Sequence, residues 1–488
     1  MTPEEFRRHG KQVIDWIADY LSNIESFPVR AQVAPGDVRR ALPVSPPECG
    51  SSFTEILADL DRTLLPGVTH WQHPRFFAYF PSNTSGAAIL GDLLSSGLGV
   101  QGMLWATSPS CTELETVAVD WLAELLGLPR HFRTDATGGG VIQDSASSAS
   151  LLATLAALSR ATGGVTAHAG ITGRHTLYVS SETHSSLEKA ARIVGLGADN
   201  VRKVPVDPAT LAMDATALDR MLATDLADGA IPVMVCATVG TTSTAAIDPV
   251  RAIGEVCRER EVWLHVDAAY AGVAAVCPEL RWVNDGVAEY ADSYVTNPHK
   301  WLLTNFDCSV LWVADRAPLL DAMSIQPEYL RNRATSSGAV IDYRDWQIPL
   351  GRRFRALKLW AVMRWYGADG LRDHIRTGAA LATEFATWVA RDPDFELHEP
   401  QVLSLVCLRP RWPELSTGEA NDATTRLMES LNASGALYLT HTKVDGRVLL
   451  RMAIGSPTTE ERHLREAWLR IREEHRKTLA DLALERAT

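Results

Sequence analysis

The sequence lacks several features that would assign it to a specialised class of protein. It has 47 basic and 59 acidic residues, for a formal net charge of −12, and no run of Lys or Arg. A nucleic-acid partner would require a surplus of positive charge to neutralise phosphates, so this balance argues against one. No stretch approaches the ~18 uncharged apolar residues of a membrane span, and the first residues lack the apolar core of a signal peptide. We therefore expect a cytoplasmic protein without a membrane segment.

The cysteines also lack the spacing of disulfide frameworks and metal sites. There are seven of them, an odd number, and no two are spaced as Cys-x-x-Cys. Scattered cysteines of this kind are typical of reduced thiols in an intracellular protein. We therefore predict no metal site.

What the chain does have is length, since 488 residues exceed the usual size of one domain. Apolar residues between positions 6 and 24 fall mostly three or four apart, which predicts one stripe of a helix, and a second helical stretch covers 52–65. Two amphipathic helices on an extended arm cannot bury their own stripes. They would pack either on another subunit or on the body of the protein, and of these two we favour a helical arm over residues 1–82 that contributes to a homodimer.

The middle of the chain alternates helical periodicity with short apolar runs. These runs are found at 175–180, 231–238, 262–267, 292–296 and 308–314. Continuous apolar strands separated by helices predict an α/β fold with a mainly parallel sheet, here over residues 83–365. From 366 to 488 long helices and two strands predict a small α+β domain. Functional groups in parallel sheets lie at the carboxyl ends of the strands.

A glycine-rich loop precedes one of the predicted helices. Residues 137–161 begin with Thr-Gly-Gly-Gly and continue through several serines into a helical run. Glycines permit close approach of the backbone, and the free amides of a helix start attract a phosphate. An ordinary serine-capped helix explains the loop equally well by itself. The loop does not have the Walker pattern, which argues against a nucleoside triphosphate.

Two charged residues stand at the ends of predicted strands. Asp267 closes the apolar run at 262–267, and Lys300 lies between Asn-Pro-His and Trp-Leu-Leu. Taken singly, Asp267 could cap the next turn and Lys300 could be a surface lysine. Taken together with the glycine loop, they form the set that holds pyridoxal phosphate: a lysine for the Schiff base, an acid for the ring nitrogen and a helix start for the phosphate.

Longer motifs support this interpretation. They are HWQHPRFFAYFP (70–81), SPSCTELETVAVDWL (108–122), GGGVIQDSAS (138–147), LHVDAAYAG (264–272), NPHKWLLTNFDCS (297–309) and DYRDWQIPLGRRFRALKLW (342–360). With these motifs the chain resembles the group II pyridoxal-phosphate decarboxylases, and within them the aromatic L-amino-acid decarboxylases. The resemblance implies the fold type I architecture of PLP-dependent transferases. It also implies decarboxylation of tryptophan, DOPA, tyrosine or phenylalanine to the arylalkylamine.

The resemblance further implies roles at the cofactor. Lys300 would form the Schiff base, Asp267 would pair with the pyridinium and His184 would stack on the ring. His299 and Tyr329 would complete the catalytic set, with Tyr329 on a closing loop as the proton donor. The remaining cofactor-binding positions would be Ala146, Ser147, Thr238, Ala269, Ser293 and Asn297. By their sequence context alone, Thr238 could be a strand-end hydroxyl and His184 a helix cap.

The substrate pocket implied by the resemblance is aromatic. Its positions are Trp71, Tyr79, Phe80, Ser82, Gln101, Met103, His184 and Gly351. The small Gly351 would leave room for an indole, whereas the aromatic residues could also belong to the core. Asp144 stands where relatives usually carry glycine, so the phosphate loop departs from the family's pattern there.

Other functions remain open on the sequence alone. An aromatic aldehyde synthase could use the same scaffold, although the presence of both Tyr329 and His184 argues against it. Decarboxylation of an acidic amino acid would require a cationic pocket where the aromatic residues stand. A nucleotide-binding regulatory protein could explain the glycine loop, but it would not explain Lys300.

Overall fold

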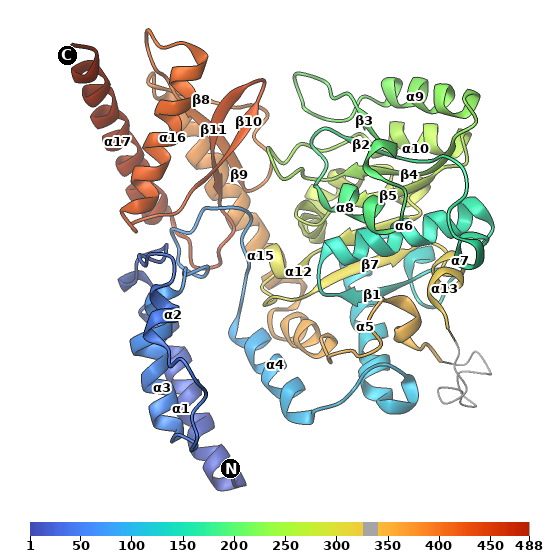
Figure 1. Cartoon of the computed structure of the whole chain (residues 1–488), viewed down its shortest axis with the longest axis horizontal. Helices are drawn as coiled ribbons and strands as arrows, with labels where there is room; N and C mark the ends of the chain where they lie inside the picture. The colour runs from blue at the N-terminus through green and yellow to red at the C-terminus, as the bar shows by residue number, and fades with distance from the viewer. Residues whose placement is uncertain (326–339, 488) are drawn as a thin grey trace. The chain divides into compact units, whose positions relative to one another are not determined.

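The chain folds into two compact units. The computed structural model describes residues 1–325 and 340–487. The larger unit comprises Ser82–Ala380 and Glu399–Leu405, and the smaller unit comprises Met1–Pro81, Leu381–His398 and Val406–Thr488. Figure 1 follows the chain through both of them. Among the described residues, no helix is both long and apolar enough to cross a membrane.

A seven-stranded sheet forms the centre of the larger unit. Its strand order is β1-β7-β6-β5-β4-β2-β3. Neighbouring strands from β6 to β3 are parallel, whereas β7 runs antiparallel to both β6 and β1. The strands are β1 (Gly139–Gln143), β2 (His175–Ser180), β3 (Val201–Val204), β4 (Ile231–Thr238), β5 (Trp263–Asp267), β6 (Ser293–Thr296) and β7 (Ser309–Val313). The predicted α/β class with a mainly parallel sheet is confirmed.

Helices cover this sheet, as near-continuous apolar strands require. The helices of the larger unit are α4 (Gly86–Leu98), α5 (Pro109–Leu125), α6 (Ala146–Thr162), α7 (Thr166–Ala169), α8 (Ser186–Ile193), α9 (Ala215–Ala227), α10 (Val250–Glu259), α11 (Val287–Tyr290), α12 (Pro298–Trp301), α13 (Ala317–Met323) and the first part of α15 (Ala356–Arg391). Among them, α5, α6, α9, α10 and α12 contact strands of the sheet. Figure 1 shows α6 near α8 and α13, with which it is in contact. The buried face of α6 is rich in alanine, and these small side chains let it pack closely on the strands.

The smaller unit combines terminal helices with a second sheet of order β10-β11-β9-β8. Its strands are β8 (Phe395–Leu397), β9 (Leu405–Pro410), β10 (Thr440–Val444) and β11 (Arg447–Ala453), and its main helices are α1 (Pro3–Ser22), α2 (Asp37–Ala41), α3 (Phe53–Asp59), α16 (Thr417–Ala433) and α17 (Glu461–Ala487). The helix predicted from the apolar spacing at 6–24 is α1, which begins at a capping box formed by Thr2 and Glu5. The division at 82 and 366 into an arm, a large domain and a small domain stays a prediction.

Candidate functional site

Lys300 lies in α12, a single turn that directly follows β6. The next residue, Trp301, is fully buried and stacks on Tyr270 with ring centroids 5.4 Å apart. Asn83 stabilises this turn through two hydrogen bonds. Its backbone N–H donates to the carbonyl of His299 at 3.0 Å, and its side-chain Oδ1 accepts from Leu303 N at 3.3 Å. The apolar residues after Lys300 therefore belong to the core, while the half-buried lysine remains at the edge of the sheet.

The carboxyl ends of the neighbouring strands place two more predicted residues beside this edge. Thr238 ends β4 and Asp267 ends β5, and the two are paired in register. Asp267 is 4% exposed, and its Oδ1 accepts from Ala269 N at 3.1 Å, which orients the carboxylate. The buried Oγ1 of Thr238 has no hydrogen-bond partner among the described residues. A buried polar atom of this kind is expected to meet a ligand or a water.

His184 lies in the loop between β2 and α8, close to the same groups. Partial burial lowers the pKa of its imidazole, the charge of Asp267 opposes this shift and the charge of Lys300 adds to it. Ser186 N donates to Nδ1 at 3.1 Å. An amide can only donate, so Nδ1 must accept and the neutral ring carries its proton on Nε2. His184 is therefore a neutral N–H donor near Asp267 and Lys300.

His299 has the same tautomer for the same reason. Its Nδ1 accepts from Cys308 N at 2.9 Å, and the residue is 5% exposed. Burial lowers the pKa of His299 to about 4, with a further contribution from the charge of Lys300. Both predicted catalytic histidines of the described chain are thus held neutral, each with its proton on the nitrogen that faces away from the supporting loop.

The glycine loop ends at a helix start, as the sequence predicts. Ser145 is the N-cap of α6 and accepts from Ser148 N at 3.3 Å. Ala146 and Ser147 occupy the first turn, where amides have no partner within the helix. Asn297 lies at the same sheet edge, since its Oδ1 accepts from Ser309 Oγ at 2.6 Å and Ser309 pairs in register with the last residue of β1.

Asp144 precedes this helix start as an exposed carboxylate. Its Oδ1 accepts from Ser145 Oγ at 3.1 Å. Its negative charge stands next to the amides proposed for the phosphate, and like charges repel. The effect of Asp144 on phosphate binding stays a prediction.

The other predicted positions are distributed differently. Ser293 begins β6 instead of ending it, and its Oγ lies 2.8 Å from both Trp263 Nε1 and His265 Nδ1, so the structure does not bring it to the carboxyl edge. Gln101 approaches Gly351, where an added Cβ would lie 3.1 Å from Gln101 Nε2.

The remaining substrate positions lie in different parts of the chain. Met103 accepts from Arg344 N at 3.1 Å through its carbonyl, and Ser82 is half-buried. In the smaller unit, Trp71 and Tyr79 stack with centroids 5.8 Å apart, and Phe80 lies under the guanidinium of Arg451. Tyr329 lies outside the described residues.

Sequence reasoning missed two residues that support this edge. One is Asn83, described above. The other is Asp248, whose carboxylate accepts from Thr238 N and Met213 N, both at 2.7 Å, and whose pKa is raised to about 6 by burial. The sequence offered one signal for Asp248. It is an isolated acidic residue that directly precedes a proline and lies shortly after the Thr-Thr-Ser-Thr run at 241–244.

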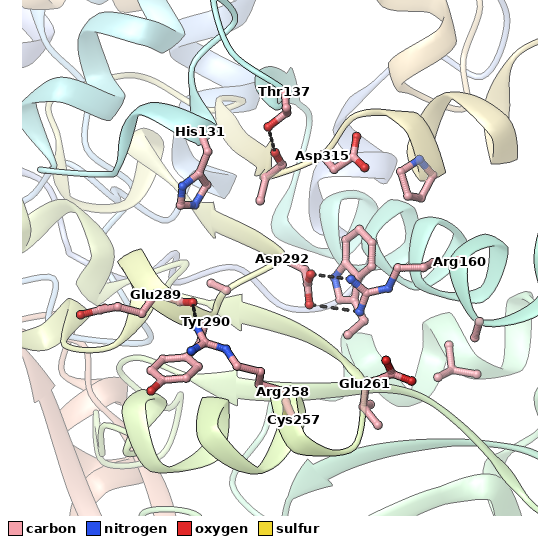
Figure 2. Close-up of a pocket in the computed structure, with 17 residues that line it drawn as sticks. His131, Thr137, Arg160, Cys257, Arg258, Glu261, Glu289, Tyr290, Asp292 and Asp315 are labelled. Atoms are coloured by element: carbon pink, nitrogen blue, oxygen red, sulfur yellow. Dashed lines mark hydrogen bonds and ion pairs between the residues drawn. The ribbon is translucent and has the colours of Figure 1, made fainter.

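A pocket of about 800 Å³ lies at the opposite edge of the sheet, beside the amino ends of β4, β5 and β6. Figure 2 shows Arg160 bonded through two nitrogens to Asp292, at 2.5 and 3.2 Å. The same guanidinium lies over the ring of Trp263, and Arg258 lies over Tyr290. Both arginines that line the pocket therefore already interact with other side chains. None of the predicted site residues lines this pocket. Volume alone does not identify the site.

The groups at the carboxyl edge fit pyridoxal phosphate. The unpartnered Thr238 hydroxyl, the oriented Asp267 carboxylate, the half-buried Lys300 and the free amides at Ala146 and Ser147 match its ring, ring nitrogen, aldehyde and phosphate. This match concerns the chemistry of the groups, and it does not depend on the aromatic positions.

Comparison with known proteins gives an independent result. Residues 35–411 match the family described as the pyridoxal-dependent decarboxylase conserved domain. Phenylacetaldehyde synthase from Arabidopsis thaliana is 47% identical over 475 residues, covering 97% of this chain and 96% of that protein. Tryptophan decarboxylase 2 from Oryza sativa subsp. japonica is 45% identical, covering 99% and 97%. The crystal structure of Oryza sativa TDC with PLP and tryptamine superposes with a TM-score of 0.95 at 41% identity, covering 98% and 99%.

Proposed function

Because the chain belongs to the pyridoxal-dependent decarboxylase family, we propose that it converts an aromatic L-amino acid to the corresponding arylalkylamine and carbon dioxide. The predictions of the family, the enzyme class and the cofactor pyridoxal 5'-phosphate are confirmed. Relatives named as tryptophan and tyrosine decarboxylases support an aromatic substrate, and phenylacetaldehyde synthases share the scaffold. Tryptophan is our first candidate because Gly351 carries no side chain to compete with an indole.

In this proposal the residues at the carboxyl edge hold the cofactor. Lys300 would form the Schiff base, Asp267 would face the ring nitrogen and Thr238 would lie beside the ring. The amides of Ala146 and Ser147, with Asn297 at the same edge as described above, would hold the phosphate. When bound, pyridoxal phosphate supplies an electron sink for the bond that breaks as carbon dioxide leaves.

The protein's own groups then act through charge and hydrogen bonding. Asp267, mostly withdrawn from water, would hold a proton on the ring nitrogen of bound pyridoxal phosphate by electrostatic attraction. His184 offers a hydrogen bond from Nε2 and remains neutral, so it can orient a carboxylate without forming a tight ion pair with it. Tyr329 would return a proton to the substrate carbon, and this role is a proposal from the sequence alone.

The observation that carries the proposal is the convergence of Thr238, Asp267, His184 and Lys300 at one sheet edge. The test is to load the purified protein with pyridoxal phosphate and supply tryptophan, DOPA, tyrosine, phenylalanine and glutamate. We expect carbon dioxide and the arylalkylamine in equal amounts from the aromatic substrates, and no turnover of glutamate. Turnover of glutamate alone would overturn the aromatic assignment.

The second candidate is an aromatic aldehyde synthase, favoured by the 47% identity to a phenylacetaldehyde synthase. It would consume oxygen and water and release aldehyde, carbon dioxide, ammonia and peroxide, so carbon dioxide without an equal amount of amine would separate it from the decarboxylase. We expect the parent protein to release amine and Tyr329→Phe to divert part of the product to aldehyde. Equal amine output from both proteins would contradict the role of Tyr329.

We also propose that the protein is a homodimer. In α4, Leu90, Leu94 and Leu98 are 50%, 61% and 60% exposed and are spaced four apart, so they form one apolar stripe. In the smaller unit α1 has no buried residue, and Phe6 is 60% exposed. Stripes of this kind usually pack on another surface. Light scattering of the parent and of Leu94→Asp tests this, and a monomeric parent would contradict it.

A cytoplasmic location is part of the same proposal. All seven cysteines have free thiols, which suits a reducing compartment. Fractionation of cells that express the protein would test the location.

A further inference from the structure

Arg352 and Glu115 form an ion pair that is buried from solvent. Both side chains are 1% exposed, and they are joined by Nη1 to Oε2 at 2.9 Å and by Nη2 to Oε1 at 2.6 Å. The guanidinium lies 4.7 Å from the ring centroid of Tyr343, and its Nε donates to Gln347 Oε1 at 2.8 Å. Removing two charges from water is costly, so a pair at this depth is weak as a source of stability and a candidate for a specific structural task.

The pair occupies the open edge of β1. Among the described strands β1 pairs with β7 only, so its other edge has no neighbouring strand. Ile142 N donates to Glu115 Oε1 at 2.8 Å, and Arg352 Nη2 donates to the Ile142 carbonyl at 3.0 Å. The ion pair stands where a further strand would stand, and it satisfies both backbone groups of Ile142. This residue directly precedes the last residue of β1, from which the proposed phosphate loop begins.

The main chain of Arg352 holds a second part of the proposed site. Its amide donates to Gln101 Oε1 at 2.5 Å, and its carbonyl accepts from Gly102 N at 3.1 Å. Gln101 and the preceding residue, Gly351, are positions predicted to line the substrate pocket. Arg352 therefore contacts the strand before the phosphate loop through its side chain and the predicted ring pocket through its backbone.

We propose that Arg352, held by Glu115, is a positioning residue that fixes the phosphate loop relative to the segment around Gln101. This inference rests on the proposed function, because it concerns the same cofactor and the same substrate. Arg352 acts through β1 and Gln101 and not on the reacting atoms. Loosening the pair is therefore expected to weaken binding of the cofactor and of the aromatic ring before it slows the chemical step.

The test compares a variant beside β1 with a variant beside β3, the two outermost strands of the sheet. Arg352→Lys keeps the charge but cannot reach both carboxylate oxygens and Ile142 together. The matched control is Asp225→Asn beside β3, the outermost strand on the opposite side of the sheet, where Asp225 accepts two hydrogen bonds from Arg202. We expect both variants to lower Tm. Only Arg352→Lys should raise the Kd of pyridoxal phosphate, by about tenfold, and raise KM severalfold, with kcat of the saturated holoenzyme within about threefold of the parent.

The outcome is decided by cofactor binding and by KM. If Arg352→Lys and Asp225→Asn show the same Kd and KM as the parent, the positioning role is overturned. If Arg352→Lys does not fold, Glu115→Gln replaces it with the same measurements, because its amide keeps the size and one acceptor for Ile142 N. The Kd is measured without substrate. A parent protein that binds pyridoxal phosphate but forms no amine would therefore overturn the proposed function alone.

Discussion

The amino ends and the carboxyl ends of the strands form two edges of the seven-stranded sheet, and the polar side chains at these two edges differ in whether they are paired with one another. At the amino edge Arg160 and Asp292 bond to each other across the pocket of Figure 2, and the arginines there stack on aromatic rings. At the carboxyl edge Thr238 ends β4 with an unpartnered hydroxyl, and two neutral histidines carry their proton on Nε2. Polar groups satisfied among themselves stabilise a fold, whereas unsatisfied but oriented groups can bind a ligand.

The sharpest test of this contrast is Lys300→Ala. We expect amine formation to fall by at least about a thousandfold, because no other group can form the Schiff base at this position. The visible absorbance that pyridoxal phosphate gains when joined to a lysine should disappear. The absorbance spectrum and an amine assay measure both effects. An unchanged spectrum would remove Lys300 as the anchor, and Arg160→Ala serves as a matched variant that keeps the spectrum.

The pH dependence of the free energy of unfolding tests whether His299, at the carboxyl edge, is held neutral. Burial lowers the pKa of His299 to about 4, whereas in the unfolded chain it titrates near its usual value of about 6.5. The unfolded state therefore binds the proton first, and the contribution of this histidine to stability is complete above pH 6.5 and is lost as pH falls toward 4. Between pH 7.5 and pH 5 the loss is about 2 kcal/mol.

Urea unfolding at these two pH values measures this loss. In His299→Asn, whose side-chain oxygen can still accept from Cys308 N, we expect the acid sensitivity to shrink by the same amount. An equal pH dependence in parent and variant would show that His299 is not the titrating group.

Gly351→Ala should have a smaller effect, on substrate choice. The new Cβ would lie 3.1 Å from Gln101 Nε2, the far end of a flexible side chain, so the fold should tolerate it. Lost space should lower kcat/KM for tryptophan relative to tyrosine by about tenfold. Competition between the two substrates measures the ratio. Gly418→Ala is the control, since nothing lies within 4 Å of its added Cβ, and a ratio unchanged by Gly351→Ala would exclude this position from the pocket.

Arg160→Ala at the amino edge should have the smallest effect. It removes a partly exposed ion pair and a cation–π contact, together worth about 1 kcal/mol of unfolding free energy. Cofactor absorbance and kcat should not change, because none of the residues proposed to hold the cofactor lies at this edge. Thermal unfolding and steady-state kinetics test both statements. A loss of cofactor binding in this variant would break the contrast between the two edges.

The sequence was sufficient for those residues whose position follows from strand order. Asp267 and Thr238 end parallel strands, so a prediction of the strands also predicts that they lie together. Ser293 lies at the start of its strand, as the predicted run at 292–296 already indicated, and its assignment to the cofactor came from the resemblance and not from strand order. The helix at 6–24 was found by its periodicity, which is a local property.

Other features depend on contacts that the sequence pattern does not encode. Asn83 reaches the Lys300 turn from more than 200 residues away in the chain, and Glu115 meets Arg352 over a similar separation. The tautomers of the histidines depend on single amide donors, Ser186 N and Cys308 N. None of these contacts has a periodic or compositional signal, so only the folded structure reveals them.

The amide bonds to the two histidines also determine how the site responds to chemical labelling. An acylating reagent reacts with the imidazole nitrogen that has the free electron pair, which in both rings is Nδ1. That electron pair already accepts a hydrogen bond from a backbone amide. Even though His184 is open to solvent on one side, it should resist such reagents in the folded protein and react only after unfolding. The hydrogen bonds that fix the tautomers of these rings should thereby also protect the rings from electrophiles.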